Sequence, residues 1–259
     1  MRNVLRKIYI ILILIFLYAP IATLIVLSFN KSKTRAKWGG FTGKWYSSLF
    51  RNSDIMGALW NTLLIAFISS LVATIIGIIA CIAIQAMKKR SRSIIIGITN
   101  IPMLNADIVT GISLMLLFIT LGFKFGFMTI LLAHITFNIP YVILSVLPRF
   151  KALNPSTYEA ALDLGASPFK AFMKVVFPDI LPGVLSGFLM AFTMSLDDFI
   201  ITHFTKGAGI DTLSTKIYSE VKKGIKPEMY ALSSIIFITV LILLFLVNYM
   251  PKENKKEKK

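Results

Sequence analysis

Three carboxylates stand inside otherwise apolar stretches of the chain: Asp107, Asp197 and Asp198. An acidic side chain in a membrane segment costs about 3 kcal/mol or more unless it finds a partner, so such residues commonly mark solute pathways. Carboxylates pair with ammonium groups, and aromatic side chains add cation–π contacts. The three aspartates are therefore candidates for the lining of a pathway for a cationic solute. The alternative for the adjacent pair is a solvated helix end or a salt bridge to a loop lysine such as Lys206, and for Asp107 a structural role.

The other reactive residue types predict no catalytic group and no metal site. His134 and His203 are far apart in the sequence, and His134 lies in an apolar run, where we expect it to make structural hydrogen bonds. The single cysteine, Cys81, permits no internal disulfide. Residues 207–209 resemble part of a glycine-rich loop but lack the lysine and the preceding strand of a phosphate-binding loop. We therefore expect no ATP hydrolysis, no cofactor and no metal.

Composition indicates an integral membrane protein. Of the 259 residues, 56% are apolar and 15% are charged, and the mean hydropathy is +0.76. Soluble domains average about 45–50% apolar and about 25% charged residues. The net charge of +16 comes from basic residues that flank the apolar runs, which favours anionic lipid headgroups over nucleic acid as the partner. A soluble enzyme, a disulfide-stabilised scaffold and a disordered tail protein are excluded.

Six charge-poor stretches are long enough to cross a bilayer, which needs roughly 20 apolar residues in a helix. They cover residues 8–29, 58–87, 101–121, 126–148, 180–204 and 229–251. In lipid the backbone must satisfy its hydrogen bonds internally, and runs of this length and continuity indicate helices. The sequence therefore predicts an all-α, polytopic membrane protein with six transmembrane helices, the first of which is a retained span and not a cleaved signal peptide.

The polar segments divide the chain into three expected parts. Residues 1–57 hold a cytoplasmic tail, the first helix and an extracytoplasmic loop; residues 58–250 form a membrane domain with five core helices; residues 251–259 form a basic cytoplasmic tail. An even number of spans places both termini on one side. With the termini inside, the inner segments hold 16 Lys and Arg residues and the outer loops 12, which slightly favours cytoplasmic termini.

The polar loop at residues 149–179 carries helix start and stop signals of its own. Asn154 followed by Pro155 is typical of an N-cap and a first helical position, and Gly165 is typical of the left-handed residue after a helix end. This part of the loop is predicted to form one short helix with a glycine hinge behind it. The alternative is an amphipathic linker that rests on lipid headgroups.

A second short helix is expected after the hinge. Ser167 and Pro168 repeat the start signal. An apolar face with helical spacing follows at Phe169, Phe172, Met173 and Val176. Pro178 is expected to stop this helix before the next span begins.

The loop resembles the E-A-A…G…I-x-L-P loop of ABC importer permeases. The matching residues are Glu159, Ala160, Ala161, Gly165 and Pro178, with Val175 and Phe177 in place of the usual Ile and Leu. The resemblance implies a cytoplasmic coupling loop that docks in a groove of an ATPase subunit. The alanines permit close helix approach, and Glu159 offers a charged hydrogen bond to the partner. Because this loop must face ATP, the resemblance implies cytoplasmic termini and places Asp197 near the outer mouth.

The resemblance covers most of the chain from about Lys44 onward. Residues 107–114, 133–148, 195–199 and 217–227 are similar to spermidine/putrescine importer permeases of the PotC type. The similarity implies a type I, binding-protein-dependent ABC importer in a bacterial cell membrane, with the MetI-like permease fold. Its implied partners are an ATP-binding subunit dimer, a PotB-like sister permease as heterodimer, and an extracytoplasmic polyamine-binding protein. Asn105 and Ala106 depart from the family, which usually has a proline before the acid.

Other functions stay open at this point. A polytopic membrane enzyme would need a cluster of His, Asp and Glu at one membrane face, whereas the acids here are spread over both faces. A secondary carrier often shows internal repeats, and none is visible. Neither class explains the spacing from Glu159 to Pro178. Among importers, the alternative cargoes are another cationic amine, an organophosphonate or an iron complex, because the binding protein makes most of the selection.

Overall fold

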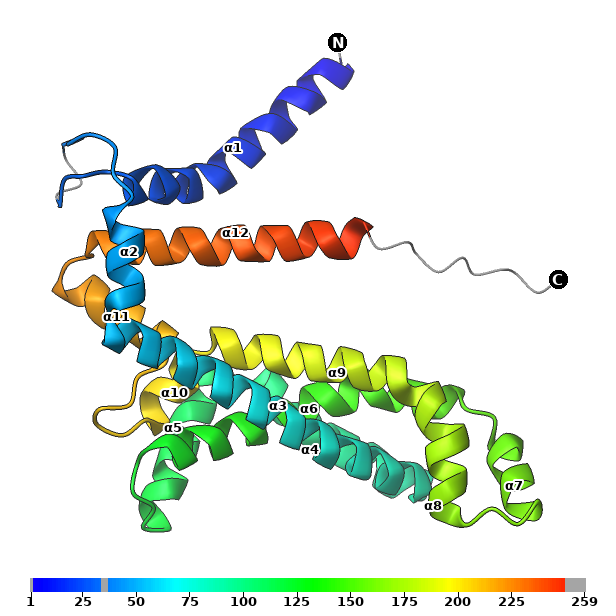
Figure 1. Ribbon diagram of the computed structural model, residues 1–259. Helices are drawn as coiled ribbons and strands as arrows, with labels where there is room; N and C mark the ends of the chain where they lie inside the picture. Colours follow the sequence, from blue (N-terminus) through cyan, green and yellow to red (C-terminus); the bar gives the residue numbers. More distant parts are fainter. Residues whose placement is uncertain (1, 34–36, 250–259) are drawn as a thin grey trace. The chain divides into compact units, whose positions relative to one another are not determined.

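The computed structural model describes residues 2–33 and 37–249 (Figure 1). This part of the chain is helical, apart from turns and one isolated antiparallel bridge between Asn30 and Phe41. The predicted all-α class is confirmed. Contacts divide the chain into two units, Met1–Met56 with Ile217–Lys259 and Gly57–Lys216, which are described separately.

The first unit contains α1 (Arg2–Ser28), α2 (Lys44–Arg51) and α12 (Pro227–Tyr249). Both α1 and α2 pack against α12. The α12 helix starts with Pro227 and carries Glu228 in its first turn, where an acid complements the helix dipole. The Glu228 carboxylate also accepts hydrogen bonds from the Ser48 hydroxyl and the Asn52 amide, so it ties α12 to α2.

The second unit contains most of α3 and the helices after it. These are α3 (Ser53–Ala86), α4 (Lys89–Leu104), α5 (Asp107–Thr120), α6 (Phe127–Ala152), α7 (Pro155–Asp163), α8 (Pro168–Ala171), the π-helical turn Phe172–Val176, α9 (Phe177–Asp197) and α10 (Ile200–Thr205). Another helix, α11 (Leu213–Lys223), leads from this unit into the first. The α6 and α9 helices are in extensive contact and run side by side (Figure 1).

Glycines allow α6 and α9 to approach closely. A Cβ atom added to Gly183 of α9 would lie 2.6 Å from Cγ of Arg149, and one added to Gly187 would lie 3.3 Å from Cα of Val142. On the α3 side, a Cβ atom at Gly77 would lie 2.5 Å from Cγ1 of Val142. The buried core around these contacts includes Ala73, Cys81, Val146, Ile180 and Val184. Small residues therefore set the spacing of the helices that carry the site.

Four helices in the described residues are long and apolar enough to cross a membrane: Arg6–Ser28, Ser53–Ala86, Phe127–Ala152 and Pro168–Asp197. The pair α4 and α5 would be a fifth, bent by 104° at its break. The sixth predicted span corresponds to α12, but its end at residues 250–251 and part of its side chains lie outside the described residues. The count of six therefore stays a prediction.

Two predicted spans are broken helices. The expected single helix over 101–121 is wrong, because Asn105 and Ala106 are extended, with ψ of 152° and 138°. Asp107 then starts a new helix, where its charge complements the N-terminal dipole. The expected helix over 180–204 ends at Asp197, and Asp198 is extended before α10 begins. Hydropathy could not reveal either break, because the backbone changes direction within otherwise apolar sequence.

Candidate functional site

The first helix of the 149–179 loop forms as its capping residues predict. The Asn154 side chain accepts a hydrogen bond from the Ser156 N–H at 3.1 Å, and Pro155 occupies the first helical position. The loop begins later than expected, because the preceding helix α6 extends to Ala152 and includes residues 149–152.

Gly165 ends α7 in the left-handed conformation, with φ of +82°. Its N–H bonds to the Leu162 carbonyl at 2.9 Å, and the Ala166 N–H bonds to the Ala161 carbonyl at 3.1 Å. This pair of bonds is the Schellman motif, which satisfies the free carbonyls at a helix end. A Cβ atom at Gly165 would meet nothing within 4 Å. Glycine is therefore favoured at this position by the positive φ angle alone, and not by a lack of space.

The second helix of the loop starts as predicted but does not stop at Pro178. The Ser167 hydroxyl accepts the Lys170 N–H at 3.4 Å. The chain then passes through the π-helical turn, in which the Phe177 N–H bonds to the Phe172 carbonyl five residues earlier. Proline has no N–H and would clash with the carbonyl four residues before it in a regular α-helix, and the wider turn relieves this clash. The helix is therefore continuous from Pro168 to Asp197.

The loop exposes several of the predicted coupling residues. Glu159 and Ala160 are exposed on α7, and Ala161 is half-buried. Leu164 and Phe169, on either side of Gly165, are 89% and 76% exposed. Leu164 was not among the predicted site residues, although a large apolar side chain in a polar loop would have been a signal for it. Apolar side chains exposed at one site are typical of a surface that binds another protein.

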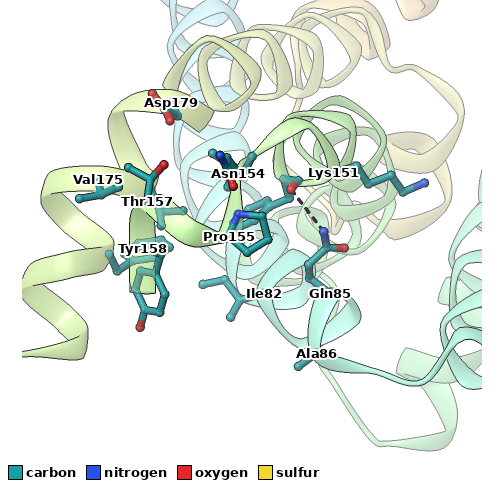
Figure 2. Close-up of a pocket in the computed structure, with 14 residues that line it drawn as sticks. Ile82, Gln85, Ala86, Lys151, Asn154, Pro155, Thr157, Tyr158, Val175 and Asp179 are labelled. Atoms are coloured by element: carbon teal, nitrogen blue, oxygen red, sulfur yellow. Dashed lines mark hydrogen bonds between the residues drawn. The ribbon is translucent and has the colours of Figure 1, made fainter. Parts of the chain in front are cut away.

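A cavity of about 600 Å³ lies beside this loop (Figure 2). It is lined from α3 by Ile82, Gln85 and Ala86, from α7 and the end of α6 by Phe150, Asn154, Thr157 and Tyr158, and from the following helix by Phe172, Val176 and Asp179. The Gln85 amide donates a hydrogen bond to the Phe150 carbonyl at 3.2 Å. Its oxygen is buried without a partner among the described residues. The side of α7 that carries Thr157 and Tyr158 therefore faces this cavity.

Asp198 is bonded into the protein. One carboxylate oxygen accepts the Ile201 N–H at 3.1 Å, and the other accepts the Thr202 N–H at 2.7 Å and the Thr202 hydroxyl at 2.8 Å. The side chain is 8% exposed. Asp198 thus satisfies two of the free N–H groups at the start of α10, those of Ile201 and Thr202.

His134 makes structural hydrogen bonds, as expected for a histidine in an apolar run. Its ring is 1% exposed, with Nδ1 2.6 Å from the Ser195 hydroxyl and Nε2 2.9 Å from the Thr202 hydroxyl. Nε2 also lies 3.4 Å from an Asp198 carboxylate oxygen. Sequence reasoning missed Ser195 and Thr202, because serines and threonines in apolar helices usually bond to their own backbone.

Asp107 and Asp197 are exposed. Asp107 is the first residue of α5, which packs against α10. Asp197 is the last residue of α9. The predicted coupling residues Glu159 to Gly165 precede one end of the helix Pro168–Asp197, whereas Asp197 and Asp198 lie at its other end. The structure thus separates the predicted coupling residues from the aspartate pair by the length of this helix.

Relatives match over almost the whole chain. The chain is 37% identical over 241 residues to the spermidine/putrescine transport system permease protein PotC of Escherichia coli K12, with 93% of this chain and 91% of the relative covered. It is 37% identical over 253 residues to the PotC protein of Haemophilus influenzae, with 98% of each chain covered. It is 36% identical over 250 residues to the putrescine transport system permease protein PotI of Escherichia coli K12, with 94% and 89% covered.

Solved structures share the fold. A bacterial ABC transporter involved in the import of the acidic polysaccharide alginate matches with a TM-score of 0.73 at 19% identity, over 96% of this chain and 93% of that chain. The MetNI methionine ABC transporter in an inward-facing conformation matches with a TM-score of 0.58 at 17% identity, over 81% and 95%. These matches confirm the expected MetI-like permease fold.

The family model that matches residues 73–251 describes the binding-protein-dependent transport system inner membrane component. Its match covers more than half of the chain, and the relatives above are permeases, which are transport subunits without catalytic activity. The resemblance to ABC importer permeases is confirmed, and the chain is a multi-pass bacterial membrane protein. This protein belongs to the family of binding-protein-dependent transport system inner membrane components.

Proposed function

We propose that this chain is a membrane subunit of an ABC importer for the polyamines spermidine and putrescine. The observation that carries the proposal is the identity of 36–37% to permeases of spermidine/putrescine and putrescine transport systems, over about nine-tenths or more of both chains. The exposed carboxylates of Asp107 and Asp197, which lie within the apolar stretches of the sequence, are consistent with a cationic cargo. The chain would form half of the translocation pathway.

The proposed partners are an ATP-binding subunit dimer, a PotB-like sister permease and an extracytoplasmic polyamine-binding protein. A match to an alginate ABC transporter in complex with its periplasmic protein supports a binding-protein partner for this fold. Glu159, Ala160 and the exposed Leu164 would contact the ATP-binding subunit, with the loop and both termini in the cytoplasm. Lipid surrounds the apolar helix faces.

Coupling would use the continuous helix from Pro168 to Asp197. Movement of the ATP-binding subunit displaces α7 and α8, which are joined through the left-handed turn at Gly165. The cavity beside α7 gives this helix room to move without forcing core side chains together. Since no regular helix stop separates α8 from α9, the displacement reaches the residues near Asp197.

The two aspartates of the pair would have different roles. Asp197, which is exposed, and Asp107 at the start of α5 would face the ammonium groups of the cargo. Asp198 would contribute to the pathway by holding α10, since its carboxylate oxygens are occupied by the N–H groups of Ile201 and Thr202.

Complementation tests this function. A bacterial strain without polyamine importers would receive the chain with its sister permease, ATP-binding subunit and binding protein, and radiolabelled spermidine and putrescine uptake would be measured. Uptake that disappears when this chain alone is omitted is the expected result. No uptake of either polyamine, with the four proteins present in the membrane fraction and periplasm, would contradict the proposal.

A further inference from the structure

Six polar side chains form a continuous hydrogen-bonded chain through the second unit. They come from α3, α6, the end of α9 and α10, and follow the order Asn138, Ser69, Ser195, His134, Thr202 and Asp198. The successive distances between bonded atoms are 3.3, 3.2, 2.6, 2.9 and 2.8 Å. All six side chains are less than a tenth exposed. The proposed transport function uses only the last of them.

The hydrogen positions at the carboxylate end of this chain follow from its chemistry. A carboxylate only accepts, so the Thr202 hydroxyl donates its single hydrogen to Asp198. That hydroxyl can therefore only accept from Nε2 of His134, and Nε2 must carry a hydrogen. The same nitrogen lies 3.4 Å from an Asp198 carboxylate oxygen. His134 thus acts as a donor toward the junction between α9 and α10.

The junction depends on these bonds because it has no regular helical backbone of its own. Asp198 is extended, with ψ of 127°, and α10 has only six residues. A short helix of this kind is held mainly by its caps and its tertiary contacts. The Ser214 hydroxyl, which donates to the Asp198 carbonyl at 2.6 Å, adds one further bond. The ring of His134 joins the end of α9, through Ser195, to α10, through Thr202.

We infer that His134 is a positioning residue for transport, which holds the junction of α9 and α10, and with it the neighbouring exposed Asp197, through hydrogen bonds to Ser195, Thr202 and Asp198. The role in transport rests on the proposed function. The structural part does not, because it can be measured without any cargo.

Hydrogen–deuterium exchange of the Ile200–Thr205 segment in the purified importer complex tests the structural part. His134→Leu removes both ring nitrogens, and we expect exchange in this segment to become roughly 5- to 100-fold faster. His134→Gln places an amide N–H near the position of Nε2 and should keep exchange within about 3-fold of the wild type. Thr136→Ala is the matched control, because Thr136 lies on the same helix but is exposed and bonds to its own backbone at Leu132.

Unchanged exchange in His134→Leu, or equal acceleration in His134→Leu and His134→Gln, would overturn the inference. If His134→Leu does not assemble, Ser195→Ala decides instead, since it removes the bond between the end of α9 and Nδ1 of His134 and leaves the Thr202–Asp198 bond in place: faster exchange supports the inference and unchanged exchange overturns it. Uptake per assembled complex then tests the transport part: a loss of about tenfold or more in His134→Leu with recovery in His134→Gln supports it. Full uptake in a variant whose α10 exchanges faster would overturn the positioning role. A wild-type complex that imports no polyamine contradicts only the proposed cargo.

Discussion

Nε2 of His134 lies 3.4 Å from a carboxylate oxygen of Asp198, although 64 positions separate the two residues in the sequence. The contact joins α6 to the junction between α9 and α10. Asp197, the residue before Asp198, is exposed. Two adjacent and chemically identical side chains therefore lie in different surroundings, and their substitution should have different effects.

Asp197→Asn should lower polyamine uptake while the complex assembles normally. A carboxylate that faces an ammonium group contributes about 1–3 kcal/mol, so uptake at limiting substrate should fall roughly 5- to 150-fold. The measurement is initial uptake of radiolabelled spermidine, normalised to the amount of this subunit in the membrane. Wild-type uptake in this variant would show that Asp197 is only a solvated helix end.

Asp198→Asn should instead lower stability. An asparagine loses the charge, and one of its two terminal atoms becomes a donor that faces the donors of α10, which should cost about 1–2 kcal/mol. We expect a lower thermal unfolding midpoint in detergent and less assembled complex. A variant with wild-type stability and strongly reduced uptake would reverse the roles assigned to the pair.

Gly165→Val should uncouple transport without preventing membrane insertion. A β-branched residue at φ of +82° is strained by about 1–2 kcal/mol, so the end of α7 should shift. ATP-driven uptake per inserted complex should fall. Gly165→Asn should be milder, since asparagine tolerates the left-handed region.

Gly97→Ala is the control for Gly165. Gly97 lies within α4 at a helical φ, and an added methyl group there would meet nothing within 4 Å. Its uptake should equal that of the wild type. Equal activity of Gly165→Val and Gly97→Ala would argue against a hinge at Gly165.

Ala160→Phe should disrupt the contact with the ATP-binding subunit. The residue is exposed on α7, so the larger side chain should fit the isolated subunit but prevent close helix approach by the partner. Co-purification of the ATP-binding subunit should decrease, while the thermal unfolding midpoint of this chain stays the same. Ala160→Ser, which remains small, should retain the partner. If both Ala160 variants retain the ATP-binding subunit, the docking surface lies elsewhere on this chain.

Gly207→Ala should destabilise the second unit. A Cβ atom there would lie 2.2 Å from the Phe125 carbonyl oxygen, and a backbone atom cannot move aside as a flexible side chain can. Overpacking of this kind costs about 1–3 kcal/mol. Thermal unfolding should reveal a lower midpoint for Gly207→Ala but not for Gly126→Ala, whose added methyl group would lie 3.8 Å from Ile210. Equal midpoints would contradict the close approach at Gly207.

Local signals predicted much of the structure of the 149–179 loop. Asn154, Ser167 and Gly165 each act on backbone groups within a few residues, so their types and spacing were enough to place two helix starts and one helix end. Pro178 was misread as a helix stop, because the π-helical turn that accommodates it has no signature in residue type. A proline in an apolar run therefore could not distinguish a stop from a distorted but continuous helix.

The hydrogen-bonded chain around His134 could not be predicted. His134 was identified as a hydrogen-bonding residue, but Ser69, Ser195 and Thr202 lie 65, 61 and 68 positions away. Which of many serines and threonines meets the ring depends on how α3, α6 and α9 pack. That packing depends in turn on close approaches at Gly77 and Gly187, whose shared partner Val142 becomes visible only in three dimensions.

Reconstitution tests the central claim most directly. The chain would be purified with its sister permease and ATP-binding subunits, inserted into liposomes, and supplied with polyamine-loaded binding protein on one side and ATP on the other. We expect uptake of radiolabelled spermidine that requires ATP, the binding protein and this chain together, and no uptake by liposomes that contain this chain alone. Spermidine flux through the chain alone, independent of ATP, would contradict the assignment of this protein as a coupled importer subunit.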